Sequence, residues 1–206
     1  MSVKAETCQR GEKFRRDGSG EPLQRLGKAR ERPGKLDFAN PAIGSLNHLA
    51  FEAVRNRNKV DIVSVTYKAT SPAQADLIAG VVPIMIDSLP VAMPQIKAGK
   101  LVPLATTLRA RASALPDTPT VIERGLEDDE YMGWYGVVAP RGVPPAIVAR
   151  LNQAINRALA EPDVRERYAA LGAVPVIESA EYFGKFLTNE RAKWRRIVRE
   201  AKVKVE

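Results

Sequence analysis

The segment NPAIGSLNHLAFE holds the only histidine of the sequence, three residues after a pair of small residues. His48 follows Gly44-Ser45 at the start of a run whose pattern predicts a helix. A catalytic histidine needs a nucleophile or a carboxylate within hydrogen-bond reach, and the sequence has neither a G-x-S-x-G elbow nor a reactive-cysteine signature. Two interpretations of His48 stay open: a side chain that satisfies local packing, or one that contacts a ligand or fixes the loop.

Gly44 and Ser45 are the residue types that build an anion site at a helix N-terminus. Gly permits a tight turn, Ser can cap, and the first backbone N–H groups carry the positive end of the helix dipole. We therefore expect their amides to face a ligand carboxylate. The arrangement recurs at Thr70-Ser71-Pro72 and at Asp87-Ser88. Three such junctions together favour an anionic small molecule over a catalytic reaction.

Short apolar runs and helical segments alternate from Leu36 onward and must position these junctions. We predict strands and helices in turn at 60–65, 70–80, 81–86, 87–99 and 101–107, with Gly80 in the C′ position that ends the first of these helices. This β-α-β-α-β order predicts an α/β fold with a parallel sheet covered on both faces. In such a sheet the junctions meet outside the carboxyl ends of the strands, where ligands bind. Pro83 and Pro103 indicate strand starts or a sheet edge.

The second half of the sequence is predicted to be mostly helical. A short helix near Pro119 is followed by a strand over 133–140. An amphipathic helix then starts at Pro144-Pro145, with an apolar face that continues to Gly172, and a final helix opens near Ser179. The apolar stripes of these helices predict faces that pack in a core.

Composition indicates a globular chain, with 206 residues and 45% hydrophobic content. One cysteine and one histidine exclude an internal disulfide and a Cys/His metal site, and we expect no metal and no cofactor. No run reaches the roughly 18 apolar residues of a transmembrane helix, and the start lacks the apolar region of a signal peptide. Expressed as written, the chain is expected to stay in the cytoplasm.

The net charge of +8 is concentrated near the start, where residues 1–35 hold 10 Lys/Arg against 5 Asp/Glu. Few large apolar residues occur over 1–21, so we predict a basic, disordered extension there. A nucleic-acid-binding arm is the alternative. Only Phe14 is interleaved with the basic residues and no recognition motif follows, so no nucleic-acid partner is expected.

From about residue 22 to the end, the sequence resembles the tripartite tricarboxylate transporter substrate-binding proteins, the Bug family of TctC-like periplasmic receptors. The resemblance rests on four ordered segments: PGKLDFANPAIGSLNHLAFE, VDIVSVTYKATSPAQADLIAG, IKAGKLVPLATTLRARASALPDTPTVIERG and GWYGVVAPRGVPPAIVARLNQAINRAL. It implies a type II Venus-flytrap fold, like that of periplasmic binding proteins, which captures a carboxylate-bearing metabolite between two lobes. It also implies a periplasmic location and membrane transporter subunits as partners.

The resemblance implies ligand contacts from three loops. These contacts come from the loop before HLA, the loop TYKA at 66–69, the acid at the end of a strand and the capping serines. The candidate ligand-binding residues are Ala42, Gly44, Ser45, His48, Tyr67, Lys68, Ser71, Asp87 and Ser88. The loop TYKA departs from the family pattern PYKG, with Thr66 where Pro is usual and Ala69 where Gly is usual.

Family members begin with an export signal and a lobe-one segment bearing a Gly-rich loop. The first twenty or so residues of this sequence resemble neither, so we expect a truncation, a wrong start site or a frameshift. We predict an extension over 1–21, a nearly complete ligand-binding lobe over 22–110, and a hinge with the return into the incomplete first lobe over 111–206.

The predicted function is that of a non-enzymatic solute-receptor fragment. The alternatives are a non-functional truncated receptor and a small α/β domain that interacts through its basic tail. A small α/β enzyme would need an acid/base or nucleophile pair that the sequence does not offer.

Overall fold

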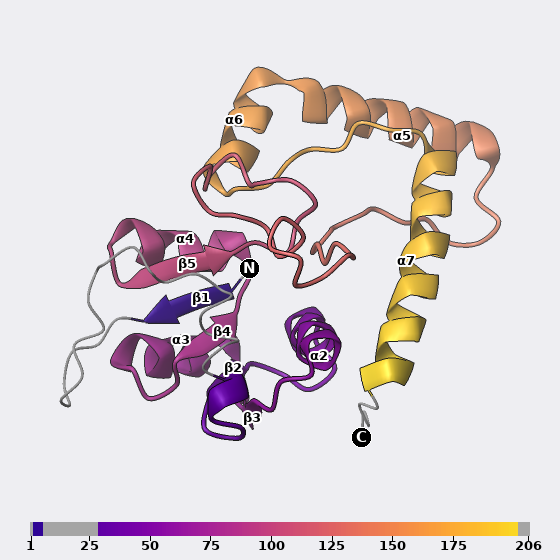
Figure 1. Cartoon of the computed structure of the whole chain (residues 1–206). Coiled ribbons are helices and arrows are strands. Elements are labelled where there is room, and N and C mark those ends of the chain that lie inside the picture. Colours follow the sequence, from indigo (N-terminus) through magenta and orange to yellow (C-terminus); the bar gives the residue numbers. More distant parts are fainter. Residues whose placement is uncertain (1, 6–28, 202–206) are drawn as a thin grey trace. The chain divides into compact units, whose positions relative to one another are not determined.

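The computed structural model describes residues 2–5 and 29–201 (Figure 1). The described residues divide into two compact units. The first comprises the residues up to Gly133 together with those from Val198 onward, and the second is Trp134–Ile197. The break expected at residue 110 falls inside the first unit.

The first unit is an α/β structure built on a five-stranded sheet of order β3-β2-β4-β1-β5. Its elements are, in chain order, β1 (Ser2–Ala5), β2 (Asp37–Asn40), α2 (Leu46–Asn58), β3 (Val63–Thr66), α3 (Thr70–Ala79), β4 (Ile84–Ile86), α4 (Leu89–Lys97) and β5 (Leu101–Ala105). The predicted alternation over 60–107 is confirmed, with strands shorter than their apolar runs. β2 was not predicted. It pairs in parallel with both β3 and β4.

Strand β1 corrects the expectation of a disordered extension for four of its residues. It runs antiparallel between β4, where Ser2 lies opposite Ile86, and β5, where Ala5 lies opposite Leu101. The sheet is therefore mixed, not wholly parallel. Pairing of this kind uses main-chain N–H and C=O groups, which every residue type but proline offers in full, so composition does not reveal it. Residues 6–21 of the predicted extension lie outside the described residues.

The prolines lie where the sequence placed them. Pro83 directly precedes β4, and Pro103 lies within β5, which is an edge strand of the sheet. Proline lacks the N–H that a central strand donates to its neighbour, so an edge tolerates it. Gly80 ends α3 with φ 75°, the left-handed conformation predicted for the residue after this helix.

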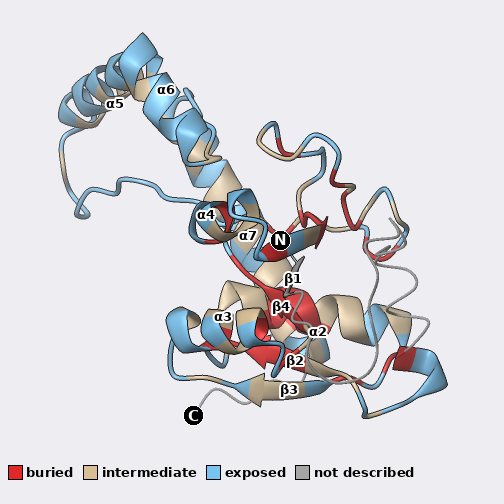
Figure 2. Ribbon diagram, turned by 90° about the vertical axis from the view of Figure 1, so that its left-hand side faces the viewer, coloured by how far each residue is buried: buried red, intermediate tan, exposed pale blue. Residues whose placement is uncertain are grey.

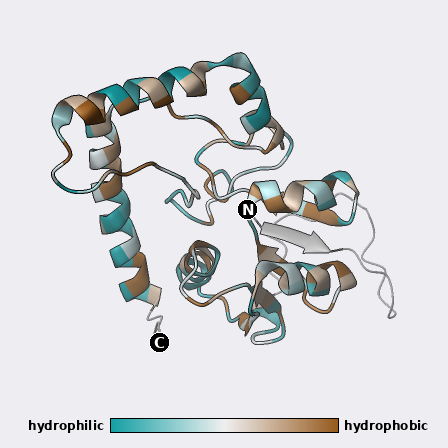
Figure 3. Cartoon of the chain, turned by 180° about the vertical axis from the view of Figure 1, so that it is seen from behind, coloured by the Kyte–Doolittle hydropathy of each residue, from teal (hydrophilic) through white to brown (hydrophobic). Residues whose placement is uncertain are grey.

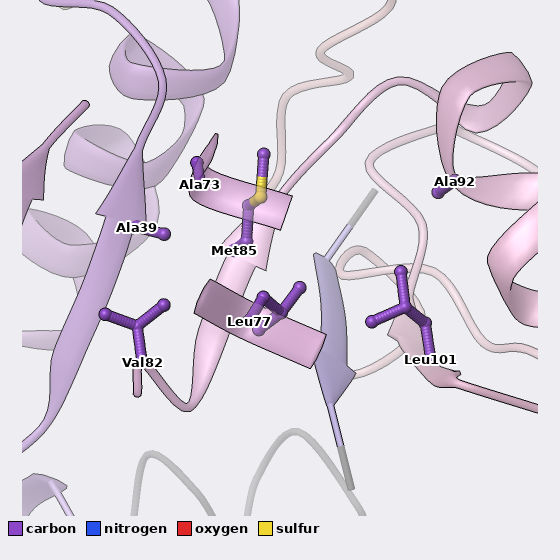
Figure 4. Close-up of a cluster of buried hydrophobic side chains, with 7 residues drawn as sticks. All are labelled: Ala39, Ala73, Leu77, Val82, Met85, Ala92 and Leu101. Carbon is purple, nitrogen blue, oxygen red and sulfur yellow. The ribbon is translucent and has the colours of Figure 1, made fainter. Parts of the chain in front are cut away.

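Helices cover the sheet on two faces. On one face Ala73 and Leu77 of α3 pack with Met85 of β4 in a fully buried cluster (Figure 4). On the other face Phe51 of α2 stacks on Phe38 of β2, with ring centroids 3.6 Å apart and planes 2° from parallel. Figure 2 shows that the buried residues gather along these strands.

The second unit contains α5 (Pro145–Ala160), α6 (Pro162–Ala170) and most of α7 (Ala180–Ala201). Ser179 caps α7 as predicted, because its Oγ accepts the backbone N–H of Tyr182 at 3.1 Å. The predicted strand over 133–140 is wrong: these residues pair with no described strand, and a strand exists only where its backbone bonds a neighbour.

The core packing expected for α5 and α6 is also wrong, since neither helix has a buried residue. Ile147 and Leu151 on the apolar stripe of α5 are about half exposed, at 49% and 50%. Figure 3 shows apolar and polar residues alternating along α5 and α7, and Figure 2 shows α5 and α6 largely exposed. Periodicity identifies the apolar face of a helix, whereas burial of that face needs a second layer, and residues 134–197 of the second unit contain no strand. None of the described helices is long and apolar enough to span a membrane.

Candidate functional site

The register of the sheet brings the three predicted junctions to one edge. Asn40 at the end of β2 lies opposite Thr66 at the end of β3, and Ala39 lies opposite Met85, one residue before the end of β4. The loops after β2, β3 and β4 therefore leave the same carboxyl edge of parallel strands.

The first junction is a closed, hydrogen-bonded loop in front of α2. Ser45 is the N-cap, as predicted, and its Oγ accepts the backbone N–H of His48 at 3.2 Å. The Ser45 N–H donates to the carbonyl of Ala42 at 3.2 Å, and the Ala42 N–H donates to Oδ1 of Asn40 at 3.2 Å. Gly44 has φ 74°, a conformation that favours glycine.

His48 fixes this loop from inside. The backbone N–H of Gly44 donates to its Nδ1 at 3.0 Å, and its Nε2 lies 3.8 Å from Oε1 of Glu52. Because Nδ1 accepts a hydrogen bond, the neutral ring carries its proton on Nε2. Burial, with a smaller contribution from the Arg55 charge, lowers the pKa of His48. The amides of Gly44 and Ser45 are thus already bonded, which corrects the expectation that they face a ligand.

Two other backbone amides of this region can meet a ligand instead. The N–H groups of His48 and Leu49 both donate to Ser45, so in the first turn of α2 only the N–H groups of Leu46 and Asn47 have no acceptor among the described residues. The first four N–H groups of any helix lack an intrahelical partner. These two carry the positive end of the α2 dipole and can receive an anion.

Glu52 is a buried acid that the sequence did not single out. Its Oε2 lies 2.7 Å from Nη2 of Arg55, which balances the carboxylate charge. Burial raises the pKa of Glu52, and Arg55 opposes that shift. The Gly44 N–H uses the lone pair on Nδ1 of His48. His48 therefore has no free lone pair with which to act as a base beside Glu52.

The second and third junctions face the opposite side of the sheet. The hydroxyl of Tyr67 donates to Oδ2 of Asp76 on α3 at 2.8 Å, and burial followed by this bond raises the pKa of Tyr67 to about 12. Asp87 is 3% exposed and accepts the Ser88 N–H at 2.7 Å and Nε2 of Gln74 at 3.2 Å. Burial raises the pKa of Asp87, against the effect of these bonds.

The predicted caps of α3 and α4 are not formed by side chains. Ala69 is the N-cap of α3, in place of Thr70 or Ser71, and Ser88 caps α4 without a side-chain hydrogen bond. Lys68, Ser71 and Ser88 are exposed at the sheet edge and carry polar groups that a ligand can reach. The candidate residues thus lie along one edge but in two groups, one on the α2 side and one on the α3 side.

Asn40 was missed by the sequence analysis although it joins the loops. It is 0% exposed, its carbonyl accepts the Tyr67 N–H at 2.8 Å, and its Nδ2 has no acceptor among the described residues. The only local signal was an asparagine that ends an apolar run directly before Pro41. Gln74, the partner of Asp87, was missed as well, because a single glutamine in a helical segment is not by itself a sign of function.

An apolar cavity of about 80 Å³ lies elsewhere, under α2, where Phe38, Phe51, Ile84, Leu104 and Val121 contribute to its lining. Such a lining suits the core and not a carboxylate. In the part of the chain that the structure describes, no group of three or more His, Cys, Asp or Glu is placed to hold a metal ion.

Comparison with known proteins gives concordant matches. The family model described as tripartite tricarboxylate transporter family receptor matches residues 22–203. A protein from the tcbD-tcbE intergenic region of Pseudomonas sp. (strain P51) is 39% identical over 86% of this chain and 53% of its own length. Protein BugT of Bordetella pertussis is 35% identical, over 88% of this chain and 56% of its own. The chain spans about half the length of these curated relatives.

Two solved structures extend the similarity to the fold. An R. palustris protein with adipate has a TM-score of 0.82 and 29% identity, covering 98% of this chain and 64% of the other. The MatC protein of Rhodopseudomonas palustris with bound malate has a TM-score of 0.73 and 28% identity, covering 96% and 65%. The fold of the described residues is thus that of part of a periplasmic binding protein, as predicted.

Proposed function

Because the chain belongs to the tripartite tricarboxylate transporter receptor family, we propose that it is part of a solute receptor that captures a small dicarboxylate. The family consists of substrate-binding receptors, and we propose no enzymatic activity for this chain. One observation carries the proposal. The loops after three parallel strands share one edge of the sheet, and the first turn of α2 offers two N–H groups there that have no acceptor among the described residues.

The chemistry of that edge suits an anion. The Leu46 and Asn47 amides and the exposed Lys68 attract negative charge, while Ser71 and Ser88 add neutral donors. In this proposal Gly44, Ser45 and His48 keep the shape of the loop, with Ala42 exposed at its surface. Tyr67 and Asp87 hold α3 against the neighbouring loops. They influence the ligand only indirectly, by keeping these elements in place.

The ligand class follows from two neighbours of similar fold. One is described with adipate and the other with bound malate, and both molecules carry two carboxylates. A second carboxylate would need a further set of donors beyond the first turn of α2. By analogy with the family we also propose a periplasmic location and membrane transporter subunits as partners.

Calorimetric titration of the purified chain tests the proposal. The ligands are acetate, malate, adipate and citrate, and the control is adipamide, which keeps the adipate skeleton without charge. We expect saturable heat with malate or adipate and none with adipamide. Circular dichroism on the same sample verifies that the chain is folded. A folded chain that binds no carboxylate would contradict the proposal and favour a non-functional fragment.

A further inference from the structure

We infer that Asn40 is a ligand-binding residue, whose Nδ2 donates a hydrogen bond to the carboxylate oxygen that also meets the first turn of α2. The inference rests on the proposed function and names a residue of the same site. Neither the capping patterns nor the loop motifs of the sequence point to this side chain.

Burial is the first observation. Asn40 is 0% exposed, yet its Nδ2 has no acceptor among the described residues. Buried polar groups are nearly always hydrogen-bonded, and an orphaned donor is unfavourable because it has lost its contacts with water. An incoming acceptor would satisfy it.

The direction of the side chain is the second observation. Oδ1 of Asn40 accepts the Ala42 N–H at 3.2 Å, and the main-chain carbonyl of Asn40 accepts the Tyr67 N–H at 2.8 Å. Both acceptors of the residue are therefore used by the two loops. A carboxamide is planar, so a bond that fixes Oδ1 also fixes where Nδ2 can donate.

The position of Asn40 along the sheet is the third observation. Because β2 and β3 are parallel and α2 connects them, α2 runs back along the sheet. Phe38 stacks on Phe51, so these two residues mark the same height along β2 and α2. Asn40 lies two residues further along β2, about 6.6 Å. Leu46 and Asn47 lie four to five residues back along α2, about 6 to 7.5 Å.

Asn40 is therefore level with the unbonded amides of Leu46 and Asn47, and alternation along β2 places its side chain on the same face as Phe38. All three groups are N–H donors, and the helix dipole adds positive potential. Such a set excludes a cation and suits a carboxylate, which can accept several hydrogen bonds at once.

Two substitutions isolate the donor. Asn40→Asp keeps Oδ1 for the Ala42 amide but replaces Nδ2 by an oxygen, whereas Asn40→Leu introduces no charge but removes both polar atoms. Their shared effect is the loss of the Nδ2 donor. We expect both variants to bind malate or adipate at least about tenfold more weakly than the parent by calorimetry. Parent-like affinity in either variant would overturn the inference.

A measurement on the unmodified chain covers the case that the variants do not fold. In a ¹H–¹⁵N spectrum, the side-chain amide resonances of Asn40 should shift as malate or adipate is added. The Asn58 side-chain amide is the internal control, because its Nδ2 already donates to the carbonyls of Val54 and Leu126. Binding without a shift at Asn40 rejects this inference and leaves the proposed function intact, whereas absence of binding rejects both.

Discussion

Nδ1 of His48 accepts the backbone N–H of Gly44 at 3.0 Å, from a position four residues further along the chain. The backbone N–H of the same histidine donates to Oγ of Ser45, so ring and backbone bind both ends of the Gly44-Ser45 pair. The single histidine of the chain is thus a structural part of the loop before α2. Its ring has no free lone pair for acid–base chemistry while this bond is made.

Replacement of His48 should show which ring atom matters. Oδ1 of an asparagine can occupy the place of Nδ1, so His48→Asn should keep the bond to Gly44 and cost little stability. His48→Leu leaves the Gly44 N–H without an acceptor and should cost about 1–3 kcal/mol. Urea unfolding of the two variants compares them directly. Equal destabilisation by both would show that the bond to Gly44 contributes nothing measurable.

Protonation of His48 should destabilise the folded chain. Its folded pKa lies below the ordinary value of 6.5, mainly because of burial and also because of Arg55. The unfolded chain then binds the proton more readily, so this contribution is complete above pH 6.5 and is lost as the pH falls from 6.5 through the lowered pKa. Unfolding free energies measured between about pH 8 and pH 5 should fall more for the parent than for His48→Asn.

Glu52 contributes to the same profile with the opposite sign. Its pKa is raised above 4.5 by burial, so its contribution is complete below pH 4.5 and is lost as the pH rises through the folded pKa. The parent and the His48→Asn variant both retain Glu52. The difference between their unfolding free energies therefore reports on His48. An identical pH profile for the two proteins would contradict the role given to His48.

Gly44→Val should do more damage than Ser45→Ala. Gly44 has φ 74°, where a β-branched residue is strongly disfavoured, and the loop would have to change to relieve the strain. Ser45→Ala removes one cap and should cost about 1 kcal/mol. We expect Gly44→Val to abolish detectable carboxylate binding and Ser45→Ala to weaken it by a few-fold. Calorimetry and thermal melts of both variants decide this, and parent-like affinity in Gly44→Val would remove the loop from the site.

Tyr67→Phe should affect stability more than ligand affinity. The hydroxyl donates to Asp76, so its removal should cost about 1 kcal/mol while malate or adipate affinity stays within a few-fold. The raised pKa of about 12 means that Tyr67 contributes stability below pH 10, which is lost as the pH rises towards 12. Ultraviolet titration of the parent should show a tyrosine that titrates near pH 12, and this transition should be missing from Tyr67→Phe. A large loss of affinity would instead place the hydroxyl in direct contact with the ligand.

The sequence by itself determined the local features of this chain. Ser45 caps α2, Gly80 ends α3 and Pro103 lies in an edge strand, as predicted. The alternation of strands and helices over 60–107 and the family are confirmed as well. Each of these depends on residues a few positions apart, through caps, allowed backbone angles and the periodicities of strands and helices.

Only the tertiary structure decided which groups meet. It placed β1 between β4 and β5, divided the predicted site between the two faces of the sheet, and left 133–140 unpaired. It also bonded His48 to the Gly44 amide and buried Asn40 with an open donor. Strand pairing, burial and hydrogen-bond partners depend on groups distant in sequence or on side-chain direction, neither of which a local pattern of residue types encodes.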